Sequence, residues 1–184
     1  MPKGPKLGRE DWRCVLDRLS AELADGPPSQ IIAIGGVAFA FAFDSRRTTQ
    51  DFDAVLDPAD APRILAAADK IAPEFGLPSG WLNERAKHAG LLPPQVSGDV
   101  HLLLKVGCID ILIPGAEQLL AMKLMAFRDE TDREDALILL RTMNTAGLDL
   151  EDVWNRVGGF VLPAKRHNTR LNLDDLWELI SEAI

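Results

Sequence analysis

Two glycines and two aspartates lie within one short segment, residues 35–53, which reads GGVAFAFAFDSRRTTQDFD. Asp51 and Asp53 are two residues apart, so they project from one face if Phe52 lies in a strand. Two like charges held side by side repel each other unless a cation lies between them. The spacing of the two acids therefore predicts a divalent metal site.

Gly35 and Gly36 follow the apolar strand candidate Ile31–Ile34 and precede a helix-compatible run, Val37–Phe43. Because glycine lacks Cβ, it can take positive φ and let backbone N–H groups approach a ligand. The N-terminus of a helix also favours anions such as phosphate. We therefore expect a phosphate site and a metal site in the same segment.

This segment resembles motif I of the nucleotidyltransferase fold. Residues 47–53, RTTQDFD, match the Arg-x-Thr-x-Asp-x-Asp form of AbiEii-like toxin-type nucleotidyltransferases. The resemblance implies a small mixed β-sheet of the polymerase-β-like type. It also implies that Gly35, Gly36, Arg47 and Thr49 bind the nucleotide.

Asp110 is a single carboxylate in the apolar run CIDILIP, residues 108–114. Burying such a group is costly unless it is paired or coordinated. In the resembling family, a third acid on a neighbouring strand completes the metal site, and Asp110 is the match to it. We therefore expect Asp51, Asp53 and Asp110 to converge on one point of one sheet. The alternative is an acid at a strand edge that faces water.

Lys123 lies on an apolar helix stripe with Ala116, Leu120 and Phe127. The resembling family has a lysine on the helix that follows the third acid, which implies that Lys123 contacts a nucleotide phosphate. The alternative is that its stem packs on apolar surface while its ammonium group reaches water.

Asp132 and Asp135 match the family's Asp-x-x-Asp pattern, which the resemblance assigns to nucleotide binding. The basic residue that commonly precedes the first acid is replaced by Thr131, so Arg128 or Arg133 would have to supply the positive charge. Asp132 is also a natural N-cap, and an acid three residues later suits a first helical turn. Helix capping is therefore the alternative role for this pair.

By resemblance, two Mg²⁺ ions would hold the attacking and leaving oxygens while a nucleoside monophosphate moves from an NTP to an acceptor. Asp51 and Asp53 would bridge the ions, and Asp110 would bind the metal near the acceptor hydroxyl and help remove its proton. The setting implied is the toxin of a bacterial toxin–antitoxin system, with an RNA 3′ end or a protein as acceptor and an antitoxin as partner. A small-molecule, antibiotic-type nucleotidyltransferase and a non-catalytic binding protein with this fold are the alternatives.

The order of elements predicts an α+β fold, a small mixed sheet followed by a helical C-terminal half. We expect a single domain, residues 1–184, with a loose tail (1–9), a sheet-bearing catalytic core (10–113) and a helical part (114–184). The apolar patterns and breakers predict helices over residues 10–24, 60–72, 116–127, 133–145, 150–157 and 173–183. They predict strands over residues 30–34, 51–56, 100–106 and 109–113, with a hairpin at 107–108. Residues 76–97 are expected to form an irregular connection.

Composition excludes several other classes of protein. Hydrophobic residues make up 47% and charged residues 26% of the chain, and no apolar run approaches the ~20 residues that span a bilayer. Cys14 and Cys108 form no paired motif, and the three histidines lack zinc-ligand spacing. With no signal-peptide pattern at the N-terminus, these features predict a cytoplasmic protein. The net charge of −8 argues against broad nonspecific nucleic-acid binding.

Overall fold

The computed structural model describes residues 4–43, 47–88, 99–145 and 147–181. The chain divides into two compact units. The first, here called the sheet unit, comprises Met1–His88 and Val100–Pro114, and the second, the helical unit, comprises Ala89–Asp99 and Gly115–Ile184. The main boundary falls after Pro114, one residue beyond the expected end of the sheet-bearing core.

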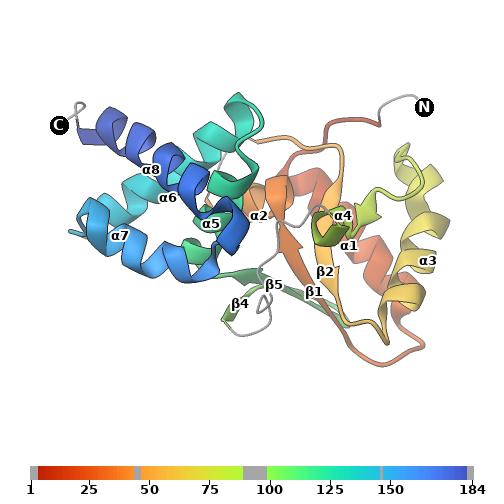
Figure 1. Ribbon diagram of the computed structural model, residues 1–184. Helices are drawn as coiled ribbons and strands as arrows, with labels where there is room; N and C mark the ends of the chain where they lie inside the picture. The colour runs from red at the N-terminus through yellow and green to blue at the C-terminus, as the bar shows by residue number, and fades with distance from the viewer. Residues whose placement is uncertain (1–3, 44–46, 89–98, 146, 182–184) are drawn as a thin grey trace. The chain divides into compact units, whose positions relative to one another are not determined.

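The sheet unit contains all the strands of the described chain (Figure 1). Its elements are α1 (Arg9–Leu23), β1 (Ser29–Ile34), α2 (Gly35–Ala42), β2 (Phe52–Leu56), α3 (Ala61–Ile71), the 3₁₀ turn η1 (Ala72–Phe75), β3 (Leu82–Asn83), α4 (Arg85–His88), β4 (Val100–Val106) and β5 (Ile109–Pro114).

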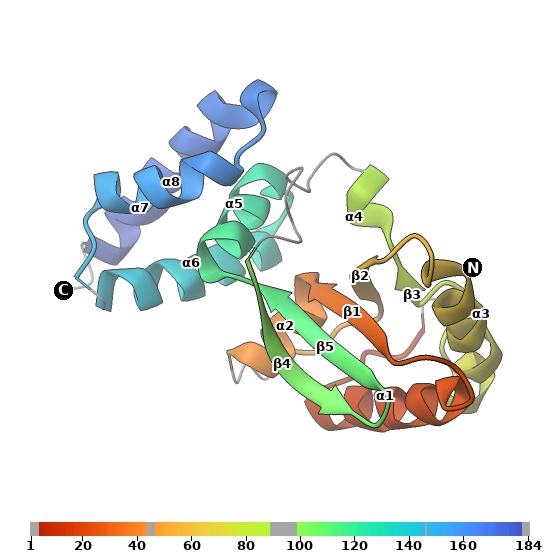
Figure 2. The same cartoon turned by 90° about the horizontal axis from the view of Figure 1, so that it is seen from below.

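The five strands form one mixed sheet in the order β3-β2-β1-β5-β4. Strand β1 pairs antiparallel with β2 and parallel with β5, while β2 and β3 pair parallel. Strands β4 and β5 form the antiparallel hairpin expected at Gly107–Cys108, and Figure 2 shows β4, β5 and β1 side by side. The expected α+β fold with a small mixed sheet is confirmed.

The two faces of the sheet differ because side chains alternate along each strand. One face is fully buried and packs against the apolar sides of α1, α2 and α3; its residues include Ile31, Ala33, Phe52, Ala54, Ile109 and Ile111. Trp12 of α1 stacks there against Trp81, at 5.5 Å between ring centroids, and meets Phe52 edge-on. The opposite face carries the polar residues, among them Asp53 and Asp110.

The helical unit is built around α5, of which every residue from Gln118 to Met125 is buried. None of the helices in the described part of the chain is long and apolar enough to cross a membrane. The elements of this unit are α5 (Ala116–Ala126), α6 (Glu130–Thr145), α7 (Leu150–Val157), the 3₁₀ turns η2 (Gly158–Phe160) and η3 (Pro163–Lys165), and α8 (Arg166–Ser181).

The last helix, α8, begins at Arg166 rather than at the expected residue 173. Its buried stripe is Thr169, Leu173, Leu176 and Ile180. Thr169 is buried although it is polar, because its hydroxyl donates to the Lys165 carbonyl at 2.9 Å within the helix. The apolar pattern alone therefore places the start of the helix too late.

The N-terminal segment also differs from the loose tail expected over residues 1–9. Leu7 and Thr49 exchange two backbone hydrogen bonds, of 2.8 and 3.0 Å, and the Gln50 side chain donates to the Gly4 carbonyl at 2.7 Å. The described part of the segment is therefore bound to the residues just before β2. This holds the loop that carries Thr49 in a fixed place.

The connection expected to be irregular over residues 76–97 contains regular structure in its described part. Strand β3 adds two residues to the edge of the sheet beside β2, and α4 follows it directly. Trp81 attaches this connection to the core, since it is 1% exposed and its indole N–H donates to the Ala68 carbonyl. Residues 89–97 of the connection lie outside the described residues.

Candidate active site

Gly35 lies where β1 ends and α2 begins, and it touches the second acid of the motif. Its φ of +66° is in the left-handed region that residues with a Cβ rarely adopt. A Cβ at this position would lie 3.0 Å from Asp53 Oδ2. Two features therefore favour glycine at this position: the positive φ and the closeness of the Asp53 carboxylate.

Gly36 makes the matching approach to Thr49. A Cβ on Gly36 would lie 3.0 Å from both Cβ and Oγ1 of Thr49. The Thr49 hydroxyl in turn donates to Asp51, with distances of 3.2 Å to its carbonyl oxygen and 3.3 Å to Oδ1. Thr49 therefore connects the glycine pair to the first acid.

These contacts bring five residues of the sequence motif together, and we call this set the carboxylate site: Gly35, Gly36, Thr49, Asp51 and Asp53. Asp53 is the second residue of β2, whereas Asp51 precedes the strand. The alternation of strand side chains therefore does not fix the position of Asp51, although the sequence predicted that it would. The hydrogen bond from the Thr49 hydroxyl holds the Asp51 carboxylate instead.

One arginine contacts the carboxylate site, and the arginine of the sequence motif packs on α2. The Arg47 guanidinium lies 5.9 Å from the centre of the Phe39 ring of α2, a distance typical of a cation–π contact. Arg85, at the start of α4, approaches Asp51 Oδ2 at 3.8 Å from a largely exposed position. The sequence pattern predicted Arg47 but not Arg85, because a two-residue strand before it is too short to show alternation.

Asp110 shares a sheet face with Asp53 but does not converge with it. Along β1, Asp53 pairs with Ile34 and Asp110 pairs with Gln30. Four residues of strand correspond to about 13 Å, and the two acids also lie on opposite sides of β1. The expected convergence is therefore wrong, because the parallel register of β1 and β5 sets Asp110 at the other end of the strand.

Asp110 has a local partner instead, since Lys105 Nζ on β4 lies 3.3 Å from its Oδ1. Within the described residues, no group of three or more acidic, histidine or cysteine side chains could hold a metal ion together. A site formed by three carboxylates is therefore absent from this part of the chain.

The remaining predicted residues lie in the helical unit, where they form what we call the lysine cluster: Lys123, Arg128, Asp132 and Asp135. Lys123 Nζ lies 3.0 Å from Asp132 Oδ1 and 2.8 Å from Asp135 Oδ2, and only 11% of the lysine side chain is exposed. The ammonium group therefore does not reach water, and the alternative of an apolar stem with an exposed head is wrong.

Asp132 is held by more than the lysine. Its Oδ2 accepts from the backbone N–H of Arg128 at 3.2 Å and from Arg128 Nε at 3.1 Å. Burial favours the neutral carboxyl and is the largest single influence, but the Arg128 hydrogen bond and the charge and hydrogen bond of Lys123 together outweigh it. The pKa of Asp132 is consequently lowered.

The capping role expected for Asp132 belongs to another residue. Helix α6 begins at Glu130, and the carboxylate of Asp129 accepts from the Asp132 N–H at 3.1 Å. Asp132 thus lies inside the first turn and turns its own carboxylate to the lysine cluster. Arg128 supplies the positive charge at Asp132, whereas Arg133 pairs with Glu130 at 3.8 Å.

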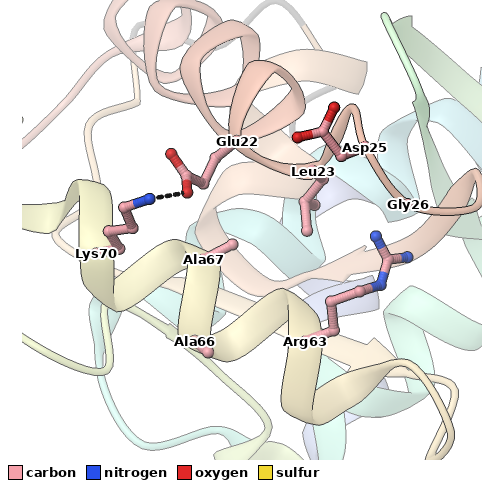
Figure 3. Close-up of a pocket in the computed structure, with 8 residues that line it drawn as sticks. All are labelled: Glu22, Leu23, Asp25, Gly26, Arg63, Ala66, Ala67 and Lys70. Carbon is pink, nitrogen blue, oxygen red and sulfur yellow. Dashed lines mark hydrogen bonds and ion pairs between the residues drawn. The ribbon is translucent and has the colours of Figure 1, made fainter.

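A separate pocket of about 460 Å³ lies between α1 and α3 and contains none of the predicted residues (Figure 3). Its charged side chains bond to groups of the unit itself. Glu22 pairs with Lys70, which lowers the pKa of Glu22, and Arg63 donates to Ser29 Oγ at 2.7 Å. We therefore assign this pocket no role in the chemistry.

The carboxylate site fits Mg²⁺ bound together with a nucleotide. Mg²⁺ takes oxygen ligands, keeps several waters, and is usually held in proteins by one or two carboxylates plus substrate phosphates. Asp51 and Asp53 supply two carboxylates. The glycine pair lets Asp53 and Thr49 lie close against the backbone, since a Cβ on Gly35 or Gly36 would lie 3.0 Å from one of them. A third protein acid is not needed for this arrangement.

Comparison with known proteins gives one match. A family model described as "Nucleotidyltransferase of unknown function (DUF6036)" matches residues 15–156. That range includes every residue of the carboxylate site and of the lysine cluster. No curated protein and no solved structure matches the chain.

Proposed function

The chain belongs to the family described as nucleotidyltransferases of unknown function, DUF6036, and from this premise we propose that it moves a nucleoside monophosphate from an NTP to an acceptor with Mg²⁺ as cofactor. The observation that carries the proposal is the contact of the glycine pair with the motif acids. Gly35 approaches Asp53 and Gly36 approaches Thr49, which itself bonds to Asp51. Such a set suits the β- and γ-phosphates and the metal of one nucleotide.

In the proposed reaction, Asp51 and Asp53 hold the metal, and the backbone of Gly35 and Gly36 binds the terminal phosphates. Mg²⁺ held there would neutralise charge that develops on the attacking and leaving oxygens. The acceptor oxygen forms a bond to the α-phosphorus and gives its proton to solvent water, as the bond between the α-phosphorus and the pyrophosphate oxygen breaks. Arg47 adds positive charge near the phosphates, and Thr49 keeps Asp51 oriented.

Lys123, Asp132 and Asp135 are proposed to contribute to nucleotide binding as well. A lysine held between two buried carboxylates has a fixed position, and a fixed cation can bind a phosphate without first losing conformational entropy.

We further propose that the protein is the toxin of a toxin–antitoxin pair and that its acceptor is an RNA 3′ end or a protein side chain. The support is the RTTQDFD segment, which resembles toxin-type nucleotidyltransferases. The second candidate acceptor is a small cationic molecule, as for antibiotic-type enzymes, because a net charge of −8 attracts cations.

The test is to incubate the protein with each labelled NTP, Mg²⁺ and a cell extract, beside an Asp53→Asn control. We expect label on a macromolecule with the parent and none with the control. Label on a small amine-bearing product would support the hypothesis of an antibiotic-type nucleotidyltransferase instead. Absence of label under every NTP, together with tight NTP-independent binding of a protein partner, would select the non-catalytic reading and reject the proposal.

A further inference from the structure

We propose that Asn83 is a positioning residue for Asp53, whose carboxylate it orients by donating a hydrogen bond from its amide NH₂ group. The inference deepens the proposed function and rests on it, because Asp53 needs a fixed orientation only if it binds a ligand. Asn83 lies on β3, in a connection that the sequence pattern predicts to be irregular.

The sheet places Asn83 directly beside Asp53. The two residues pair across β2 and β3, and Ile34 pairs with Asp53 on the other side. Adjacent strands lie about 4.8 Å apart, and paired residues project from the same face, so an amide and a carboxylate in this row are within reach of a direct hydrogen bond. Because Ile34 is apolar, Asn83 is the neighbour in this row that can donate.

The orientation of the Asn83 amide is fixed by its oxygen. Oδ1 accepts from the backbone N–H of Arg85 at 3.0 Å, so the NH₂ group must point the other way. Asn83 is 8% exposed, and its Nδ2 has no hydrogen-bond partner among the residues that the structure describes. A buried amide donor of this kind ordinarily has a partner.

The hydrogen bond to Arg85 alone does not account for an asparagine here. That bond forms the turn from β3 to α4 and needs only an acceptor, which aspartate or serine would supply equally well. Neither of those residues would bury an unused NH₂ group. The donor is explained if the Asp53 carboxylate turns toward it when the carboxylate site is filled.

The experiment uses the full chain and three variants: Asn83→Ala, Asn83→Ser and the control Gln30→Ala. Serine keeps a short donor and acceptor, whereas alanine keeps neither. Gln30 carries an exposed amide on the same sheet face, four residues along β1 from the row of Asp53. Binding of Mn²⁺ is measured by electron paramagnetic resonance with each of the four α,β-methylene NTP analogues, beside the melting temperature without ligand.

We expect Asn83→Ala to weaken Mn²⁺–analogue binding about tenfold or more per folded molecule, the scale found when a partner of a metal ligand is removed. Asn83→Ser should recover much of this loss, and Gln30→Ala should bind like the parent. If Asn83→Ala melts lower but binds normally, Asn83 only shapes the turn and the inference is overturned. A serine variant as weak as the alanine variant also overturns it. If the parent itself binds no Mn²⁺–analogue, the proposed function fails, and the role of Asn83 fails with it.

Discussion

The carboxylate site and the lysine cluster each contain two aspartates a few residues apart, but the two pairs differ in exposure and in their partners. Asp51 leaves 42% of its side chain exposed, with Arg85 at 3.8 Å, in a site lined by glycine backbone. Asp132 and Asp135 are buried and bonded to Lys123 at 3.0 and 2.8 Å. The carboxylates of the first pair are accessible to a ligand, whereas those of the second pair form ion pairs inside the protein.

The difference follows from where each pair lies. Asp53 is on the open face of the sheet beside a glycine that has no side chain to fill the space. Asp132 and Asp135 lie on the side of α6 that packs on α5, where an unpaired charge would be strongly destabilising. An Asp-x-Asp and an Asp-x-x-Asp pattern thus acquire different roles from their surroundings rather than from their spacing.

The largest effect is expected from Lys123→Met, which removes the ammonium group held between the buried carboxylates of Asp132 and Asp135. Removing one partner of a buried ion pair costs about 3–5 kcal/mol, so the free energy of unfolding in denaturant should fall by about that amount. The control is Lys105→Met, whose exposed ammonium pairs with Asp110 and should contribute less than about 1 kcal/mol. A raised KM for NTP per folded molecule, beside that loss of stability, would support the proposed phosphate contact of Lys123, whereas an unchanged KM would reject it.

Asp51→Asn and Asp53→Asn should act in the opposite sense on stability. Each removes one member of a like-charged pair whose repulsion is roughly 1 kcal/mol at ~4 Å in water, so each should melt at or above the parent temperature in EDTA while losing activity. Melting curves in EDTA test this directly.

The same melting curves, repeated with Mg²⁺ and NTP, test whether these ligands bind at the carboxylate site. These bind the native state and should stabilise the parent by mass action, but neither variant to a comparable extent. Equal stabilisation of all three proteins would locate the metal elsewhere. Variants that melt well below the parent in EDTA would make the two acids structural.

The lysine cluster should also affect how the stability of the protein changes at acidic pH. Because the folded pKa of Asp132 is lowered below its ordinary 3.8, the stability it contributes is complete above that value and is lost as pH falls through the folded pKa. As pH falls below 3.8, the melting temperature of the parent should therefore fall more steeply than that of Asp132→Asn. Parallel curves would mean that Asp132 titrates normally.

The smallest effect is expected from Asp110→Asn. Its carboxylate pairs with an exposed lysine and lies about 13 Å along the sheet from the row of Asp53. Stability should change by less than about 0.5 kcal/mol, and the affinity for Mn²⁺ with an NTP analogue should stay at the parent value. A loss of that affinity would restore Asp110 to the metal site and contradict the register argument.

Local features of the sequence determined much of the fold. The helical periods of α5 and α7, the Gly107–Cys108 hairpin and the glycine pair before α2 are each encoded within a few residues, because hydrogen bonds and allowed backbone angles there involve near neighbours. The contact of Gly35 with Asp53 also lies within one short segment, because β2, the next strand after α2, pairs antiparallel with β1.

Tertiary structure decided what depends on pairing between distant strands and helices. The parallel register of β1 and β5 moved Asp110 away from Asp53, and the two-residue pairing of β2 with β3 brought Asn83 next to it. Packing of α6 on α5 buried the Lys123 ammonium between two acids. Sequence patterns report which side of an element is apolar, but the register between elements is set by how whole surfaces fit together, and that fit is encoded in no single segment.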